Sequence, residues 1–564
     1  MQDVFGKAKV QIEEEIEKVL TTLVSDGTYD DIGEVSIDIE EPREKNNGDF
    51  SCNIAMKIVK LVKKAPAQIA NDIIERFNKE GTYVKEIQCA GPGFINFYLS
   101  DDIRFDNLKD VIEKKEDFGK SDIGKGTRVL VEFVSANPTG LLHMGNARGG
   151  ALGDGIAAVL SATGYNVERE FYVNDAGNQI ERFGESLAAR YIQQIKGENA
   201  IEFPEDGYHG EDIIDRAKEF IEINGDKYID GDVQEMKDAL VAFSLEKNLA
   251  SIKKTLEEYR IKYDTWFSEK QMYTDGEIDN TVKFFEDNGL TYEKDGAIWF
   301  KATEFGNEKD EVLIRANGLP TYLTGDIAYH RNKFVTRKFD RVINLLGADH
   351  HGHVARMEAS LRAMDIDPDK MDMVIFQLVK LMRNGEVVRM SKRTGKAISL
   401  SDLLEEIGVD AARFFFNTKS AGVHLDFDLE LAVKKSNENP VFYIQYAHAR
   451  INSIIALMKE EGMEIPNEND VDLTLLKDNT EKELMDILMK LPEEVRISAK
   501  TLEPSRLTRY AYDVASAFHS FYNACRIKGE SEEIQKARLL LCYATMIVIK
   551  NTLDLLKISA PEKM

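Results

Sequence analysis

Histidine and glycine residues gather in one segment whose residue types and spacing suit the binding of phosphate. The segment VEFVSANPTGLLHMGNARGGALGDG spans residues 131–155 and holds His143, Gly145 and four later glycines. Its first part has the pattern of a buried strand and its second part that of a helix. A helix that begins at the end of a parallel strand offers free N–H groups and partial positive charge to phosphate. His143 would then donate to a phosphate; the alternative is a structural histidine in a tight turn.

The later glycines are costly in a helix, so they need a reason. Each costs roughly 1 kcal/mol relative to alanine in a helix interior. We expect the glycines to let the helix press against the sheet or against a bound nucleotide. They are Gly149, Gly150, Gly153 and Gly155.

A second segment is basic and lies far along the chain. RMSKRTGKAISLSDLLEEIG (389–408) joins Arg389, Lys392, Arg393 and Lys396 to a glycine and two serines. A short mobile loop of this kind can close on a triphosphate and offset charge that develops in a transition state. The alternative is an exposed basic turn before an acidic helix.

Length and composition limit the fold and the class of protein. A chain of 564 residues is too long for one core, so two to four domains are expected. The sequence has no run of eighteen apolar residues, so we expect no membrane span. The N-terminus lacks the apolar core of a secretory signal. The four cysteines are far apart and suit buried thiols in a reducing compartment. The net charge of −26 argues weakly against a protein coated in nucleic acid but allows local basic tracks.

The order of patterns along the chain predicts an α/β protein with further domains at both ends. Residues 1–118 mix strands and helices, and residues 119–375 form a parallel α/β domain in which RVLVEFV is a central strand. An acidic helical insertion is expected at about 185–290 within that domain. Residues 376–438 carry the basic loop, and residues 439–564 are almost entirely helical.

Together, the glycine-rich segment and the basic segment resemble the signatures of the class I aminoacyl-tRNA synthetases. HMGN (143–146) is similar to the first signature, and RMSKR (389–393) to the second. Longer blocks resemble the arginyl-tRNA synthetase family across the whole chain. Two positions depart from the signatures: Asn146 replaces a histidine, so one nucleotide contact is made by an amide or lost, and Arg389 replaces a lysine. The longer blocks include GDFSCNIAMKIVKLVKKAP (48–66), FYVNDAGNQIERFGESLAARY (171–191), LPTYLTGDIAYH (319–330), LGADHHGH (346–353) and NPVFYIQYAHARI (439–451).

The resemblance implies both a fold and a reaction. The expected fold is a Rossmann-like class I catalytic domain, a small α+β N-terminal domain that binds the tRNA elbow and an all-α anticodon-binding domain. The expected reaction is ATP-dependent attachment of L-arginine to its tRNA through an arginyl adenylate, with Mg²⁺ bound to ATP. The resemblance also implies a cytoplasmic monomer that works without a membrane and without a tightly bound metal.

The same resemblance assigns roles to individual residues. His143 and Lys392 are expected to act on the transferring phosphate, and Asp349 to hold the ribose. The other residues expected at ATP are Pro138, Gly145, Asn146, Gly347, His353, Val388, Met390 and Ser391. The residues expected at arginine are Glu132, Ser135, Asn137, Tyr322, Asp326 and His350. Those expected at tRNA are Tyr443, Tyr446 and Arg450, for which core packing is the alternative.

Physical reasons support the expected arginine pocket. A guanidinium needs a planar set of acceptors, which carboxylates supply. Tyr322 and Asp326 are four residues apart, so a helix would turn both toward one pocket. Glu132 lies on an otherwise apolar strand, where a carboxylate needs a partner; the alternative is an ion pair at the strand end.

Three alternatives remain open at this point. The histidines at positions 350, 351 and 353 could bind zinc, although a clear fourth ligand is missing. The chain could be a class I synthetase for another amino acid, such as cysteine or glutamine. It could also be a non-catalytic paralogue that binds tRNA, against which the intact His143, Gly145 and Lys392 argue.

Overall fold

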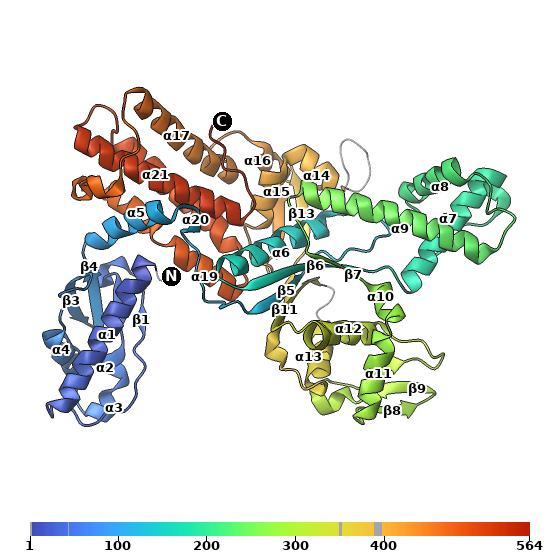
Figure 1. Cartoon of the computed structure of the whole chain (residues 1–564), viewed down its shortest axis with the longest axis horizontal. Helices are drawn as coiled ribbons and strands as arrows, with labels where there is room; N and C mark the ends of the chain where they lie inside the picture. The colour runs from blue at the N-terminus through green and yellow to red at the C-terminus, as the bar shows by residue number, and fades with distance from the viewer. Residues whose placement is uncertain (1–2, 43, 349–351, 389–397) are drawn as a thin grey trace.

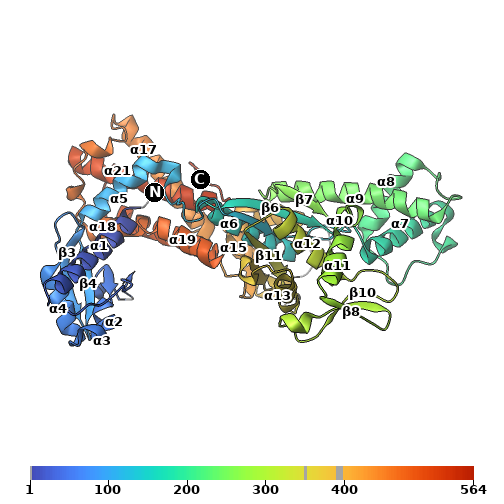
Figure 2. The same ribbon diagram turned by 60° about the horizontal axis from the view of Figure 1, so that its bottom comes forward.

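The computed structural model describes residues 3–42, 44–348, 352–388 and 398–564. An N-terminal domain, a central α/β domain and a helical C-terminal domain make up an elongated molecule, and a helical arm extends from its far end (Figures 1 and 2). The predicted fold class is confirmed by this order of elements and by the central parallel sheet. Within the described ranges, we find no helix with the length and apolar character needed to cross a membrane.

The N-terminal domain is built on a four-stranded antiparallel sheet of order β1-β2-β4-β3. The turn predicted at residues 91–93 joins β3 to β4, and Gly93 adopts a φ of 130° there. A Cβ on Gly93 would lie 2.7 Å from the Pro66 side chain, so this turn requires glycine. The elements are α1 (Val4–Ser25), β1 (Ile39–Glu40), β2 (Phe50–Cys52), α2 (Ile54–Lys57), α3 (Val59–Val62), α4 (Pro66–Arg76), β3 (Val84–Ala90) and β4 (Phe94–Leu99). The next helix, α5 (Asp102–Lys114), packs on the C-terminal helices as well as on α1.

The central domain contains a five-stranded parallel sheet of order β12-β11-β5-β6-β7. Its first strand in the chain, β5, lies in the middle, and the chain adds strands first on one side and then on the other. This order places a topological switch point between β5 and β11, where ligands bind at the carboxyl ends of strands in such folds. The elements are β5 (Arg128–Glu132), α6 (Met144–Ala162), β6 (Asn166–Val173), β7 (Thr265–Ser268), β11 (Arg341–Gly347) and β12 (Met371–Phe376).

The helical arm corresponds to most of the expected insertion. Its helices have a small core of their own, formed around Phe183, Tyr191 and Phe220. Residues 265–268 form β7 and pair with β6, so this part of the expected range belongs to the central sheet. The arm consists of α7 (Asn178–Lys196), α8 (Glu211–Asn224) and α9 (Val233–Glu258).

Below the central sheet in Figure 1, a small antiparallel sheet packs with four helices. One of these helices, α12, carries two of the predicted site residues. A short π-helical turn, Asn332–Thr336, follows α12 directly. The elements are α10 (Glu269–Thr274), α11 (Glu277–Asp287), β8 (Thr291–Lys294), β9 (Ala297–Phe300), β10 (Glu311–Ile314), α12 (Tyr322–Arg331) and α13 (His353–Ala363).

A three-stranded sheet and short helices connect the central domain to the C-terminal helices. The long helix α17 starts with Pro440 in its first turn, where a missing N–H costs nothing. The connecting elements are β13 (Val379–Arg383), β14 (Glu386–Val388), α14 (Leu400–Ile407), α15 (Val409–Phe416), β15 (Leu425–Asp428) and α16 (Leu429–Val433). The C-terminal helices are α17 (Pro440–Glu460), α18 (Asn479–Leu488), α19 (Leu491–Thr501), α20 (Ser505–Ala524) and α21 (Glu532–Leu555).

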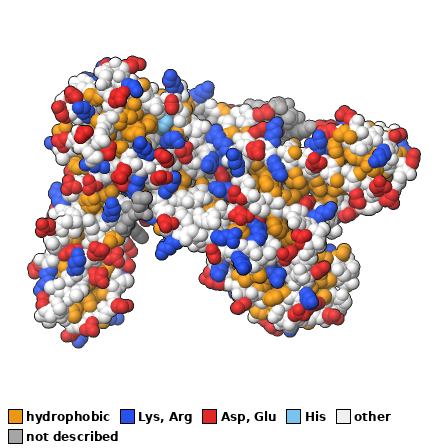
Figure 3. Space-filling view, in the orientation of Figure 1, with side chains coloured by type: hydrophobic (Ala, Val, Ile, Leu, Met, Phe, Trp, Pro, Cys, Tyr) orange, Lys and Arg blue, Asp and Glu red, His pale blue; other side chains and the backbone are white. Residues whose placement is uncertain are grey.

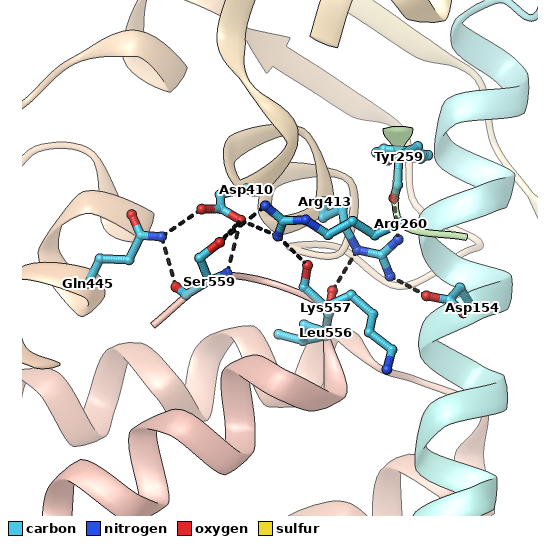
Figure 4. A network of polar contacts seen from close by, with 9 residues as sticks. All are labelled: Asp154, Tyr259, Arg260, Asp410, Arg413, Gln445, Leu556, Lys557 and Ser559. Atoms are coloured by element: carbon cyan, nitrogen blue, oxygen red, sulfur yellow. Dashed lines mark hydrogen bonds and ion pairs between the residues drawn. The ribbon is translucent and has the colours of Figure 1, made fainter. Parts of the chain in front are cut away.

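A buried arginine joins the central domain to the C-terminal tail (Figure 4). Arg413 on α15 pairs with Asp154 of α6 at 2.5 Å and donates to the carbonyl oxygens of Tyr259 and Leu556 at 2.9 and 2.7 Å. The side chains of Arg413 and Asp154 are 0% and 3% exposed. Nearby, Asp410 accepts from the Ser559 backbone at 2.9 Å. The tail after α21 is therefore held against α6, the helix that carries the first signature.

Candidate active site

The loop after β5 holds a strained backbone at the switch point. Val134 and Ser135 have φ values of 69° and 40°, in the left-handed region that costs a non-glycine residue about 1–3 kcal/mol. The Ser135 hydroxyl holds this conformation because it donates to Glu132 Oε1 at 3.0 Å and accepts from the Tyr172 N–H at 3.1 Å. Strain of this kind is concentrated at functional sites.

The glycines of α6 face neighbouring protein groups at short distance. A Cβ on Gly153 would lie 2.3 Å from Phe133, and one on Gly150 would lie 2.8 Å from Ile261. A Cβ on Gly149 would meet the ring of Phe376 at 3.0 Å. Of the two reasons that we expected for these glycines, close packing of the helix against the sheet is the one that the contacts support.

The start of α6 brings the first signature next to the segment that follows the second. His143 is the residue before the helix, and its N–H donates to Asn146 Oδ1 at 3.0 Å. The Leu142 carbonyl accepts from the Leu400 N–H at 2.8 Å, and His143 pairs with Ser399 across this contact. Asn146, the third residue of α6, therefore caps the start of the helix, and the His143 side chain in turn meets the Asn146 backbone N–H. Partial burial lowers the pKa of His143, which favours the neutral ring.

Tyr322 and Asp326 lie one turn apart on α12, as predicted. Tyr322 is 59% exposed, which places it among the most exposed large hydrophobic residues that the structure describes. The Asp326 side chain is 41% exposed. His353 Nε2, at the start of α13, lies 3.4 Å from Asp326 Oδ2. The surrounding protein and then the nearby Glu132 raise the pKa of Asp326 to about 7. A cationic ligand would stabilise the ionised form of this carboxyl.

Glu132 has partners for both of its oxygens. Lys333 Nζ lies 2.6 Å from Glu132 Oε2, and Ser135 uses Oε1. The ion pair that we kept as the structural alternative for Glu132 is therefore present. Glu132, at the end of β5, is therefore held in place near Asp326, and Lys333 neutralises its charge. Lys333 was not predicted from the sequence, because its burial depends on Glu132, which lies 201 residues away in the chain.

Glu269 is a further acidic group that the sequence analysis missed. Its side chain is buried at the start of α10, and Oε2 has no hydrogen-bond partner among the described residues. Burial, followed by the charges of Asp326 and Asp175, raises the pKa of Glu269 to about 7. A cavity of 370 Å³ is lined by Glu269 and Tyr322 together with Tyr273 and Arg315. A small ligand near Tyr322 thus has room to enter the cavity beside Glu269 Oε2, which has no hydrogen-bond partner among the described residues.

Other predicted residues lie along the same edge or outside the described ranges. Asn137 is exposed and accepts from Asn174 Nδ2 at 3.0 Å, and the Pro138 carbonyl accepts from Asn248 on α9 at 2.9 Å. Gly347 ends β11 and Val388 ends β14. The predictions for Asp349, His350, Met390, Ser391 and Lys392, and the zinc alternative that involves His350 and His351, lie outside the described residues. Across the part of the chain that the structure describes, no three His, Cys, Asp or Glu side chains are grouped to hold a metal.

The predicted tRNA residues form an aromatic cluster with residues of α20. Tyr443 packs on His519 with ring centres 4.6 Å apart, and the Arg450 guanidinium lies over Tyr446 at 4.7 Å. All three predicted side chains are only partly buried. The members contributed by α20 are Tyr512, His519 and Tyr522. The predicted residues are thus partly packed against α20 and partly exposed to a ligand. The helical spacing of the α20 aromatic residues was the signal from which they could have been predicted as well.

Comparisons with known proteins agree over the whole chain. Three family models match: the arginyl tRNA synthetase N-terminal domain over residues 8–99, the class I (R) tRNA synthetase catalytic domain over 107–455 and the DALR anticodon-binding domain over 444–564. Proteins named arginine–tRNA ligase from Acetivibrio thermocellus and Ruminiclostridium cellulolyticum are 60% and 58% identical, each over all of both chains. The arginyl-tRNA synthetase structure from Thermus thermophilus is similar in fold, with a TM-score of 0.75 at 22% identity over 99% of this chain and 100% of its own.

Proposed function

The chain belongs to the arginyl-tRNA synthetase family, and from that premise we propose which of its residues carry the reaction. It is an arginine–tRNA ligase, which attaches arginine to tRNA at the expense of ATP. In the class I reaction, a carboxylate oxygen of arginine attacks the α-phosphorus of ATP, and the bond from that phosphorus to pyrophosphate breaks. The terminal adenosine of tRNA then attacks the arginyl carbonyl through its 2′-hydroxyl, and AMP leaves.

The proposed phosphate site is the start of α6. His143 and Gly145 lie at this helix start, and the N-terminal end of a helix favours negative charge. The contact between Leu142 and Leu400 supports the proposal because it brings the segment that follows the second signature to the same place. We assign Lys392 and the neighbouring Met390 and Ser391 to the triphosphate from the resemblance alone. ATP would enter as its Mg²⁺ complex, as a substrate.

The proposed side-chain site for arginine is the pocket at α12. Asp326 carries this proposal, because it is a partly exposed carboxylate whose raised pKa shows that Lys333 and Arg356 do not offset its burial and the charge of Glu132. The guanidinium of arginine would donate to this carboxylate through its planar set of N–H groups. Tyr322 lies one turn away and lines the 370 Å³ cavity together with Glu269, and the charge of Glu132 acts on Asp326 from the end of β5. Ser135 and Asn137 lie on the loop where the α-amino and carboxyl ends of the substrate would meet ATP.

The proposed tRNA contacts fit the charge distribution of the surface. On the face drawn in Figure 3, Lys and Arg side chains gather over the middle of the molecule, whereas acidic side chains are frequent on the N-terminal domain. A chain of net charge −26 can therefore still offer phosphate a local basic track. Unpaired anticodon bases would stack on the aromatic cluster of α17 and α20. We also propose, from the resemblance, a monomer that works in the cytoplasm.

Amino-acid-dependent exchange of labelled pyrophosphate into ATP, assayed with and without tRNA, tests the proposed function. Arginine alone among the amino acids should support exchange, and tRNA should increase it. Exchange with another amino acid would point to a different class I enzyme. Binding of tRNA without any exchange would point to the non-catalytic alternative.

A further inference from the structure

Lys333 is a fully buried lysine behind the proposed arginine pocket. Its side chain is 0% exposed, and its ammonium group donates to Glu132 Oε2 at 2.6 Å and to Asn344 Oδ1 at 2.8 Å. The ammonium also lies over the ring of Tyr329, 3.8 Å from its centre. These three partners match the three donors of an ammonium group. The π-helical turn after α12 carries Lys333 to this position.

The contacts of Lys333 continue to the second acidic residue of the pocket. Asn344 Nδ2 lies 3.0 Å from His330 Nε2, and His330 Nδ1 lies 2.8 Å from the backbone oxygen of Asp326. Because a carbonyl only accepts, Nδ1 of His330 carries the hydrogen, and Nε2 then accepts from the amide of Asn344. The Asn344 oxygen is left to accept from Lys333. Burial holds the pKa of His330 well below its usual value, which agrees with a neutral ring.

A single chain of hydrogen bonds therefore links the two carboxylate residues. It runs from Glu132 at the end of β5 through Lys333, Asn344 and His330 to the backbone of Asp326 on α12. Lys333 donates both to Glu132 and to Asn344, Asn344 donates to His330, and His330 donates to the Asp326 backbone oxygen. All three linking side chains are buried, so water does not compete with their contacts.

We propose that Lys333 is a positioning residue for arginine, which holds Glu132 and Asp326 at the separation and charge that one guanidinium requires. The inference rests on the proposed function, in which the guanidinium meets Asp326 beside Glu132. Lys333 would not touch the substrate. It neutralises the charge of Glu132, so that Asp326 and Glu269 are the carboxylates left to meet an incoming cation.

Stability alone is a poor explanation for this lysine. Burying an ion pair carries a desolvation cost for each ion, and apolar residues of similar volume often stabilise a fold as well or better. Asp326 feels both partners of the pair, because Glu132 raises its pKa and Lys333 lowers it. The charged groups that face the Asp326 carboxylate are Glu132 from β5, Glu269 from α10, Lys333 from the turn after α12, and His353 and Arg356 from α13. Loss of Lys333 leaves this group with more negative charge around it.

The test compares Lys333→Met with the parent chain in full tRNA charging assays. The KM for arginine should rise by about 10- to 100-fold, the range found when a partner that orients a binding group is lost, while the KM for ATP stays unchanged. The pH at which arginine use reaches half its maximum should also move upward, because Asp326 becomes harder to ionise. A merely structural role would not separate the two substrates or move the pH profile.

Two further variants make the result decisive. Arg341→Met breaks an ion pair of the same 2.6 Å length, with Asp372 at the other end of the sheet, and should change neither KM. Asn344→Ala keeps the Lys333 pair but cuts the chain to His330, and should raise the arginine KM by about two- to tenfold. This variant serves if Lys333→Met does not fold.

Each outcome bears on a separate claim. An unchanged arginine KM in Lys333→Met, or in Asn344→Ala where only that variant folds, would overturn the inference. Equal rises in the KM values for arginine and ATP would overturn it as well, since they would mark a general loss of structure. A parent chain that does not charge tRNA with arginine would instead overturn the proposed function.

Discussion

Replacement of Gly153 by alanine should loosen the contact between α6 and the central sheet. An added Cβ would lie 2.3 Å from Cγ and 2.5 Å from Cβ of Phe133, whereas carbon atoms in contact keep about 3.5–4.0 Å. The helix would have to move away by more than about 1 Å. Overpacking costs about 1–3 kcal/mol, and alanine returns about 1 kcal/mol of helix propensity. Since the overlap is deep, we expect a net loss of about 1–2 kcal/mol, or about 2–4 °C in Tm for each kcal/mol.

Tryptophan fluorescence can follow this loss in the central domain. The chain has two tryptophans, and Trp266 stacks on Phe171 of β6 with ring centres 4.5 Å apart. A Trp299→Phe background leaves Trp266 as the reporter of the sheet. Gly325→Ala, in α12, is the matched control, because a Cβ there meets nothing within 4 Å. The control should be neutral or more stable, and a Gly153→Ala chain as stable as its parent would refute the packing argument.

The remaining predictions concern charge and domain contacts. Asp326→Asn should raise the KM for arginine by about tenfold or more and leave that for ATP unchanged, because a charge-assisted contact is lost; equal changes would count against the assignment. Arginine affinity of the parent should fall as the pH drops below about 7, since the raised pKa of Asp326 makes this carboxyl gain a proton there, and a flat calorimetric profile would contradict it. Arg413→Met should destabilise the chain by about 3 kcal/mol in thermal melts, the lower end of the cost of breaking a buried ion pair, because Asp154 keeps only its longer contact with Arg169 at 3.3 Å; an unchanged melting temperature would show that this ion pair does not stabilise the chain. Removal of residues 1–100 should weaken tRNA binding in filter assays but spare ATP binding, and loss of both in a folded fragment would refute this division.

Spacing and local pattern were enough to predict the main elements of the fold. RVLVEFV, an apolar run with one carboxylate, forms the middle strand of the parallel sheet, and the glycine turn at residues 91–93 joins two strands. Pro440 begins a long helix. Each of these follows from residues close together in the chain.

Long-range contacts account for what the sequence did not reveal. The partner of Glu132 is 201 residues away at Lys333, and Asp154 meets Arg413 across 259 residues. No periodicity encodes such pairs. Residues 265–268 were assigned to the helical insertion because they lie between helices, yet they close the edge of the sheet. Glu269 follows them and was missed for the same reason: its position in the pocket depends on which strand precedes it.

Acylation of purified tRNA with each labelled amino acid, by the parent chain and by Asp326→Asn, tests the central claim most directly. We predict that the parent attaches arginine alone and only when ATP and Mg²⁺ are present. We predict that Asp326→Asn needs far more arginine for the same rate but no more ATP. Attachment of another amino acid, or equal use of arginine by both chains, would contradict the claim that the carboxylate on α12 selects the substrate.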